Sequence, residues 1–207
     1  MRNLTAFLLL TLLIACNKDK QTEQQLPPNS FTRYMGFSIG NYWVYNVYRI
    51  DTAGNELLMP LKDSCYVEKD TIINGKTYIK FVEPNHKHYW RDSLDYIVSN
   101  EYEIIYANNN FRDTFIKKEY DSMAMMYRRM CDKYVITHTT EGDFETKTMQ
   151  TIYHYKPPFG GFYTGKDMQW NVRYADNVGI VEQTTLLASD YHLERRLLRH
   201  FIKGKSE

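Results

Sequence analysis

Hydrophobic and polar residues alternate in short runs along most of this chain, and the pattern predicts β-strands rather than helices. The runs are rich in Tyr, Val, Ile, Thr and Phe, and clusters of Asn, Asp and Gly separate them. In the first run, residues 39–50, every second residue from Trp43 to Arg49 shares one face, which we expect to point into the core. The other runs expected to form strands are residues 61–69, 87–91, 95–99, 102–106, 111–117, 134–140, 145–155, 180–188 and 191–202.

The strongest local signal is the dipeptide Asn74-Gly75, which lies between two further runs, residues 70–73 and 76–82. Both residues tolerate the positive φ of a type I′ turn, so a tight hairpin is expected here. The segment 121–134 is ambiguous: Met123, Met126 and Met130 fit a helical face, whereas Met123 and Met125 also fit a strand. The pattern leaves both alternatives open.

Many short strands with close turns favour an all-β antiparallel meander, because parallel strands need long crossover connections. A sheet of this size must curl or close. We therefore expect a meander curled into a barrel or half-barrel, with a two-sheet sandwich as the alternative and at most one short helix.

The amino terminus carries one positive charge, Arg2, then an apolar run over residues 4–14, then Ala15-Cys16. The run is about half the roughly 20 residues that a spanning helix needs. The segment resembles the lipobox signal peptide of bacterial lipoproteins. The resemblance implies that residues 1–15 are removed and that Cys16 receives a diacylglyceryl group and usually a further acyl chain such as palmitate, enough lipid to hold the protein stably on a membrane.

Residues 16–30 are polar and contain almost nothing to bury, so we interpret them as the lipidated cysteine and a flexible tether. Residues 31–207 have the size of a single β-rich domain. The expected location is the cell envelope, on the outer membrane, with the periplasmic and surface faces both open. The partner implied by Cys16 is the membrane itself.

Three stretches resemble small uncharacterised lipoproteins of the Bacteroidota: residues 40–45 (GNYWVY), 70–78 (DTIINGKTY) and 177–181 (NVGIV). They are mainly strand and turn sequences. The resemblance implies a β-rich fold and an envelope location, and it implies no activity.

The charge balance bears on which partners the protein binds, and the cysteine content bears on whether it forms a disulfide. Without Arg2 the 26 Lys and Arg become 25, against 25 Asp and Glu, and this balance argues against nucleic acid as a partner. Once Cys16 is lipidated, Cys65 and Cys131 remain. They form a disulfide, or each is a small buried residue on its own strand, and the sequence leaves both readings open.

Metal and cofactor chemistry finds little support. His86 and His88 share one face of an expected strand, a spacing that zinc and copper sites use, but no third ligand lies nearby in the sequence. The methionines between residues 123 and 130, with Cys131, are soft ligands of the kind that bind copper(I), although adaptable core packing explains them more simply. We therefore expect no metal and no cofactor.

Catalytic motifs are absent as well. The chain has no Gly-x-Ser-x-Gly elbow and no glycine-rich phosphate loop, and carboxylate pairs such as Glu101 and Glu103 are common on any solvated strand. This favours a protein that is not an enzyme, and we expect no catalytic residue.

Aromatic residues supply the remaining candidate site, because they surround the loop that contains Pro157, Pro158, Gly160 and Gly161. Exposed, they would bind a small ligand, a glycan, a lipid or a protein; buried, they would plug the barrel. The candidates are Phe159, Phe162, Tyr163 and Trp170. The sequence thus predicts a lipid-anchored, non-enzymatic domain that binds a ligand or partner, and its alternatives are an envelope hydrolase or a structural subunit of an outer-membrane assembly.

Overall fold

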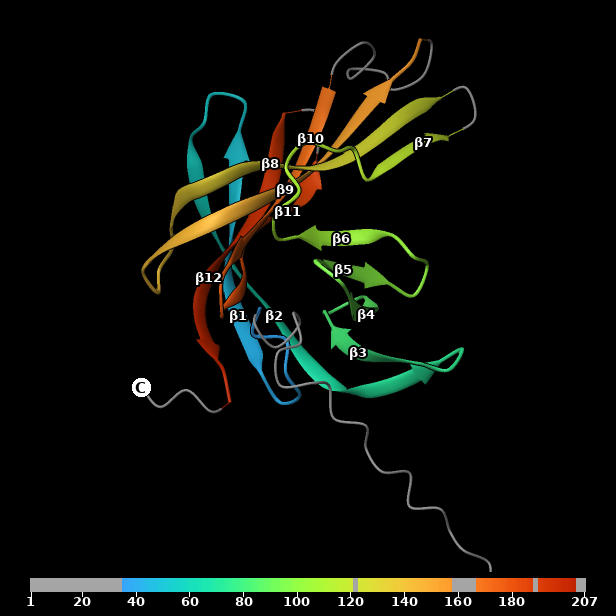
Figure 1. Cartoon of the computed structure of the whole chain (residues 1–207). Helices are drawn as coiled ribbons and strands as arrows, with labels where there is room; N and C mark the ends of the chain where they lie inside the picture. Colours follow the sequence, from blue (N-terminus) through green and yellow to red (C-terminus); the bar gives the residue numbers. More distant parts are fainter. Residues whose placement is uncertain (1–34, 121–122, 158–166, 188–189, 204–207) are drawn as a thin grey trace, which may run out of the picture.

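The computed structural model describes residues 35–120, 123–157, 167–187 and 190–203 (Figure 1). These residues form one antiparallel sheet of twelve strands. The strands are β1 (Tyr42–Asp51), β2 (Glu56–Ile73), β3 (Lys76–Val82), β4 (Lys87–Ser93), β5 (Tyr96–Ser99), β6 (Ile104–Ala107), β7 (Ile116–Tyr120), β8 (Ala124–His138), β9 (Asp143–Tyr155), β10 (Asp167–Ala175), β11 (Gly179–Leu187) and β12 (Tyr191–Phe201).

The sheet is a meander whose first and last strands pair with each other. Its order is β6-β5-β4-β3-β2-β1-β12-β11-β10-β9-β8-β7, so the two edge strands, β6 and β7, are consecutive in the sequence. The sheet curls into a nearly closed barrel (Figure 1). The predicted all-β barrel is therefore confirmed, the two-sheet sandwich is excluded, and the described residues contain no helix.

Side chains rather than backbone bonds bridge the opening between the edge strands. Arg128 of β8 lies 3.1 Å from Glu103, just before β6, and Lys147 of β9 donates to Asn108, just after β6, over 2.8 Å. The hydroxyl of Tyr174 on β10 donates to the carbonyl of Ile105 over 3.4 Å. The barrel is thus closed by polar contacts from β6 to β8, β9 and β10.

The alternation expected for β1 holds for most of the strand. Trp43, Tyr45 and Val47 are buried, whereas Arg49 is exposed, 3.7 Å from Asp190, with its guanidinium over the ring of Tyr191. The prediction was wrong for Arg49. The pairing of β1 with β2 shifts between Asn46 and Tyr48, and beyond this shift Ile50 is buried while the Arg49 charge stays in water.

The segment before β1 fills one end of the barrel. Met35 and Phe37 are fully buried, and the Phe37 ring lies 5.6 Å from Trp43, 5.5 Å from Phe81 and 5.3 Å from Trp90. The indole of Trp43 donates to the carbonyl of Val178 over 2.6 Å, which ties this end to the loop before β11. The loop around Pro157 and Gly161, for which an exposed binding surface and a buried plug were the two alternatives, lies almost entirely outside the described residues.

The hairpin predicted at Asn74-Gly75 is confirmed: β2 ends at Ile73, β3 begins at Lys76, and the two turn residues have φ of 49° and 72°. The ambiguous segment 121–134 contributes the start of β8, a strand, from Ala124. The strand expected at 111–117 was misplaced, because β7 begins only at Ile116. The strand β10 had not been predicted.

The β8–β9 hairpin bends sharply and crosses the outside of the barrel. Its register shifts twice between Met130 and Val135, and Tyr134 has a φ of 61°. Beyond the bend, Thr140 accepts a hydrogen bond from Asn46 of β1 over 3.0 Å, and Glu141 lies 2.7 Å from the His200 ring on β12. Since β10, β11 and β12 lie between β9 and β1 in the sheet, this hairpin arm (residues 135–146) passes over all three (Figure 1).

Within the described part of the chain, no helix could cross a membrane.

Candidate ligand-binding cavity

The interior of the barrel contains a cavity of about 260 Å³. Two-residue spacing on each strand turns alternate side chains inward, and seven segments of the barrel contribute to the wall. The lining residues are Glu83, His88, Trp90, Ile105, Arg128, Met149, Thr151, Tyr153, Trp170, Val172, Tyr174, Ile180 and Gln183.

Aromatic rings form much of this wall. Trp90 stacks against the rings of Phe81, 4.6 Å away, and His88, 5.4 Å away, and these two rings lie 6.4 Å from each other. Tyr174 packs edge-on against Tyr106 at 4.9 Å. The indole of Trp170 donates to the carbonyl of Thr184. The rings are fixed by neighbours, so they offer rigid apolar surface to a bound molecule.

A buried ion pair supports the polar side of the cavity. Arg195 of β12, only 2 % exposed, donates to the carboxylate of Glu83 and, over 2.5 Å, to the amide oxygen of Gln183. Its guanidinium lies 4.7 Å from the centre of the Tyr45 ring. His88 Nε2 lies 3.1 Å from the second oxygen of Glu83. Both carboxylate oxygens of Glu83 are therefore engaged.

This arrangement holds Glu83 in its ionised form. Burial by itself would raise the pKa of this carboxyl, but the hydrogen bond from His88 and the charge of Arg195 outweigh burial and lower the pKa to about 2. Glu83 is consequently an anion throughout the physiological range.

Arg128 supplies a second polar group on the wall. Its Nε donates to Thr151 and its Nη1 to Glu103, each over 3.1 Å. Within the described residues, its Nη2 group has no hydrogen-bond partner. The side chain therefore combines a role in closing the barrel with an available donor at the cavity.

The site residues predicted from the sequence lie in different parts of the structure. Trp170 lines the cavity, whereas Phe159, Phe162 and Tyr163 lie outside the described residues. His88 lines the cavity and contacts Glu83; His86 is exposed, with its ring 6.2 Å from that of His88. Across the described ranges, no three His, Cys, Asp or Glu side chains come together as metal ligands.

Cys65 and Cys131, the two cysteines among the described residues, are free thiols. Cys65 on β2 is buried and donates to the Tyr45 hydroxyl over 3.5 Å, and Cys131 on β8 is half-buried beside Asp132. Burial raises the pKa of both thiols to about 12, with the Asp132 carboxylate adding to the effect at Cys131. Both are therefore protonated and unreactive at neutral pH.

Sequence reasoning missed Glu83, Arg128, Gln183 and Arg195, although one signal was present. Arg195 alternates with Leu193 and Leu197 on one face of the expected strand 191–202, and a charge on an otherwise apolar face needs a buried partner. The identity of that partner was beyond reach, because Glu83 is 112 residues away in the chain.

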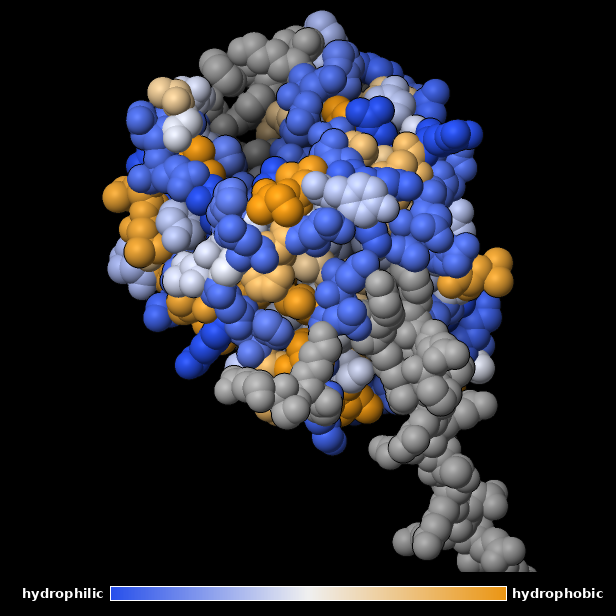
Figure 2. Space-filling model, turned by 60° about the vertical axis from the view of Figure 1, so that its left-hand side comes forward, coloured by the Kyte–Doolittle hydropathy of each residue, from blue (hydrophilic) through white to orange (hydrophobic). Residues whose placement is uncertain are grey.

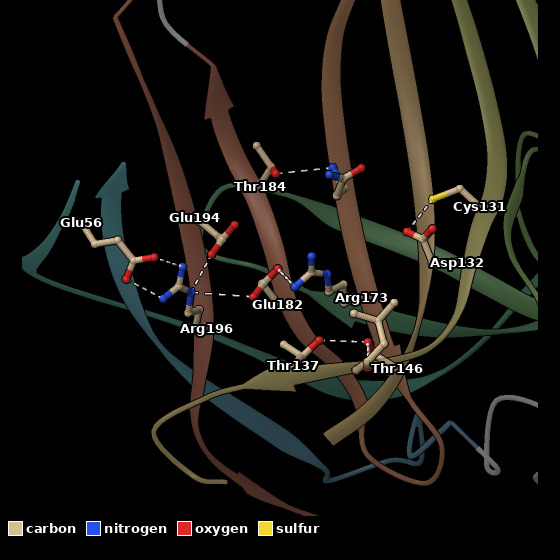
Figure 3. A network of polar contacts seen from close by, with 12 residues as sticks. Glu56, Cys131, Asp132, Thr137, Thr146, Arg173, Glu182, Thr184, Glu194 and Arg196 are labelled. Carbon is tan, nitrogen blue, oxygen red and sulfur yellow. Dashed lines mark hydrogen bonds and ion pairs between the residues drawn. The ribbon is translucent and has the colours of Figure 1, made fainter. Parts of the chain in front are cut away.

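A second charge cluster lies on the outer face of the barrel, near the hairpin arm (Figure 3). Arg196 binds Glu56 through two hydrogen bonds and Glu194 over 2.6 Å, and Arg173 lies 2.8 Å from Glu182. Burial and the neighbouring Glu194 raise the pKa of Glu182 to about 7, against the opposing charges of Arg173 and Arg196. The cluster links β2, β10, β11 and β12, and it does not line the cavity.

Comparison with known proteins gives a likeness of fold. No protein-family model and no curated protein matches the chain. A "putative exported protein with YmcC-like fold" from Bacteroides fragilis matches over 79% of this chain and 96% of its own, with 12% identity and a TM-score of 0.45. A "putative lipoprotein" from Parabacteroides distasonis matches over 80% and 96%, with 15% identity and a TM-score of 0.43. Likeness at this level concerns the path of the chain and says nothing about a ligand.

Proposed function

We propose that this protein is a lipid-anchored component of the cell envelope, held by lipid on Cys16, whose barrel binds a small cyclic ligand. The observation that carries the binding function is the cavity of about 260 Å³, lined by aromatic and polar side chains inside a rigid sheet. Ligand sites usually combine such apolar walls with a few convergent polar groups. The lipobox-like sequence ending at Cys16 supports the envelope location.

The size of the cavity limits the ligand. Binding pockets commonly span roughly 300 to 1,000 Å³, and this cavity lies just below that range. An apolar cavity of roughly 150 Å³ already accepts benzene. A cavity of about 260 Å³ therefore suits a fused ring, or one ring with a short substituent.

The polar groups of the wall indicate which substituent. The oxygens of Glu83 are occupied by Arg195 and His88, and the amide oxygen of Gln183 by Arg195. The wall also carries the hydroxyls of Thr151 and Tyr153, the NH₂ group of Gln183 and Nη2 of Arg128. The last two are donors only. A ligand that carries an acceptor, such as a carboxylate or carbonyl, would satisfy them.

Filling the cavity should abolish this binding. Val172 lies on the cavity wall between Trp170 and Tyr174, so Val172→Trp places a large ring where the ligand would sit. We expect the variant to bind 2-naphthoate at least about tenfold more weakly than the parent, measured by titration calorimetry, a difference of roughly 1.4 kcal/mol. The neutral 2-methylnaphthalene should bind the parent less tightly than naphthoate does.

Gln169→Trp is the matched control, because Gln169 is exposed on the opposite face of the same strand. It should bind naphthoate as the parent does. A parent that binds neither compound, or a Val172→Trp variant that binds as well as Gln169→Trp, would exclude the cavity as the site.

One observation favours the hydrolase alternative: Glu83 contacts His88 at a cavity, as a carboxylate orients a catalytic imidazole. A low pKa makes Glu83 a poor proton donor, however, and among the described residues His88 has no hydrogen bond with a Ser, Thr or Cys side chain. The pair fits the support of a polar wall better than it fits a nucleophilic site.

A further inference from the structure

Three exposed aromatic side chains form a row across three neighbouring strands. Tyr42 of β1 is paired in register with Tyr66 of β2 on one side and with Phe201 of β12 on the other. Their exposed fractions are 42%, 45% and 48%, and the rings of Tyr42 and Phe201 stack at 5.6 Å. Their chain neighbours Trp43 and Cys65 are buried in the barrel, so this aromatic row (Tyr42, Tyr66 and Phe201) faces outward.

The aromatic row lies at the end of the barrel where the chain leads in from Cys16. Asn41, directly before Tyr42, donates to the carbonyl of Gly36 over 2.5 Å and accepts from the backbone of Lys203 over 2.8 Å. The first described residue, Met35, therefore lies close to the row. Eighteen residues separate it from Cys16. An unstructured chain of that length has a mean end-to-end distance of roughly 21 to 25 Å, so a lipid on Cys16 would keep this end of the barrel near the membrane.

Side chains around the row fit a lipid surface. Tyrosine and phenylalanine rings favour the boundary between headgroups and acyl chains. Three cations flank the rings. Lys203 lies two residues after Phe201, Arg199 pairs with Val44 beside Tyr42, and Lys87 of β4 pairs with Val82, which pairs with Tyr66. These cations lie where anionic headgroups would be. The nearby Lys80 is neutralised by Glu68.

Exposed apolar residues also occur far from this end of the barrel. On the face shown in Figure 2, hydrophobic side chains occur in small separate groups within a mainly hydrophilic surface. Leu58, 55% exposed, pairs with Tyr48 of β1, whereas Tyr66 pairs with Tyr42. The six residues from Tyr42 to Tyr48 place Leu58 roughly 20 Å from Tyr66. Leu58 therefore marks the same outer face at the far end of the barrel.

We infer that the aromatic row rests on the lipid surface to which Cys16 is anchored, so that the barrel is held against the membrane in one orientation. This inference depends on the anchoring part of the proposed function. The contact is with the boundary region of an anionic bilayer, and the lipid on Cys16 supplies the attachment.

Tryptophans placed at single positions report this contact. The mature lipidated chain, purified from membranes, is reconstituted into vesicles of phosphatidylcholine and phosphatidylglycerol with brominated acyl chains. After subtraction of the parent signal, the added tryptophan of Tyr42→Trp and of Phe201→Trp should emit at shorter wavelength and lose intensity to bromine. The added tryptophan of Leu58→Trp should do neither.

Flotation of the same samples separates the two claims. If the chain floats with the vesicles but positions 42 and 201 are quenched no more than position 58, the docking surface is wrong and the anchor stands. If the chain does not float, the anchor fails and the docking surface fails with it. If positions 42 and 201 are shielded in native membranes but not in the vesicles, the aromatic row contacts a protein partner and the inference is wrong.

Discussion

Replacing Arg195 by methionine is expected to lower the free energy of unfolding by roughly 3 to 5 kcal/mol, because Glu83 would remain as a buried charge without its guanidinium partner. Arg195 is 2 % exposed and also packs over Tyr45, so part of the loss comes from packing. Urea unfolding followed by tryptophan fluorescence measures the change.

The double variant Arg195→Met, Glu83→Gln distinguishes charge from packing. It removes the buried carboxylate together with the guanidinium and should recover much of the lost stability. The other carboxylate near Arg195, Asp63 at 3.7 Å, is partly exposed to water and costs less when it loses this partner. A double variant as unstable as Arg195→Met alone would mean that the pair contributes little beyond the volume of the arginine.

Acid unfolding gives an independent signature of the same pair. The pKa of Glu83 is about 2 in the folded chain, below its ordinary value of 4.5, so the folded state binds fewer protons between these values. The stabilisation is complete above pH 4.5 and disappears as the pH falls through 2, a loss of about 3 kcal/mol. The Glu83→Gln variant should lack this component, so parallel pH curves for parent and variant would contradict the assignment.

Gly179→Ala is expected to destabilise the protein by about 3 kcal/mol, one part from backbone strain and the larger part from steric overlap. Gly179 has a φ of 96°, and a Cβ there would lie 2.9 Å from the carbonyl oxygen of Met35 and 3.0 Å from the Phe37 ring. Both neighbours belong to the segment that fills the barrel end, and the carbonyl is backbone that cannot rotate away.

Gly75→Ala is the control for the strain alone. Gly75 has a φ of 72° in the type I′ turn, and a Cβ there would meet nothing within 4 Å. Its replacement should cost only about 1 kcal/mol. Equal losses of melting temperature in the two variants would show that Met35 and Phe37 do not pack tightly on Gly179.

Local patterns predicted the sheet well because each strand carries its own alternation. The turn at Asn74-Gly75 needs only two residues, and both were recognisable. The strand β10 was missed although Trp170, Val172 and Tyr174 alternate with polar residues, since it follows a loop rich in Pro and Gly whose aromatics suggested a surface instead. The strand expected at 111–117 was misplaced because this part of the chain connects the two edge strands and has little ladder to join.

The cavity could not be predicted from such patterns, because it depends on closure of the barrel. Glu83 precedes β4, and Arg195 lies on β12; only the pairing of β1 with β12 joins the two halves of the sheet that carry them. The alternation of Leu193, Arg195 and Leu197 is a signal that a charge faces the core, but the predictions did not include it. The alternation does not show which carboxylate meets the charge, nor that space remains beside the pair.

Native mass spectrometry of the mature chain, released from its own membranes in mild detergent, tests the ligand-binding account most directly. The account predicts a small-molecule adduct on the parent and on Gln169→Trp, lost on collisional activation and absent from Val172→Trp. A parent that carries no adduct, even after addition of 2-naphthoate, or a Val172→Trp variant that retains one, would contradict it.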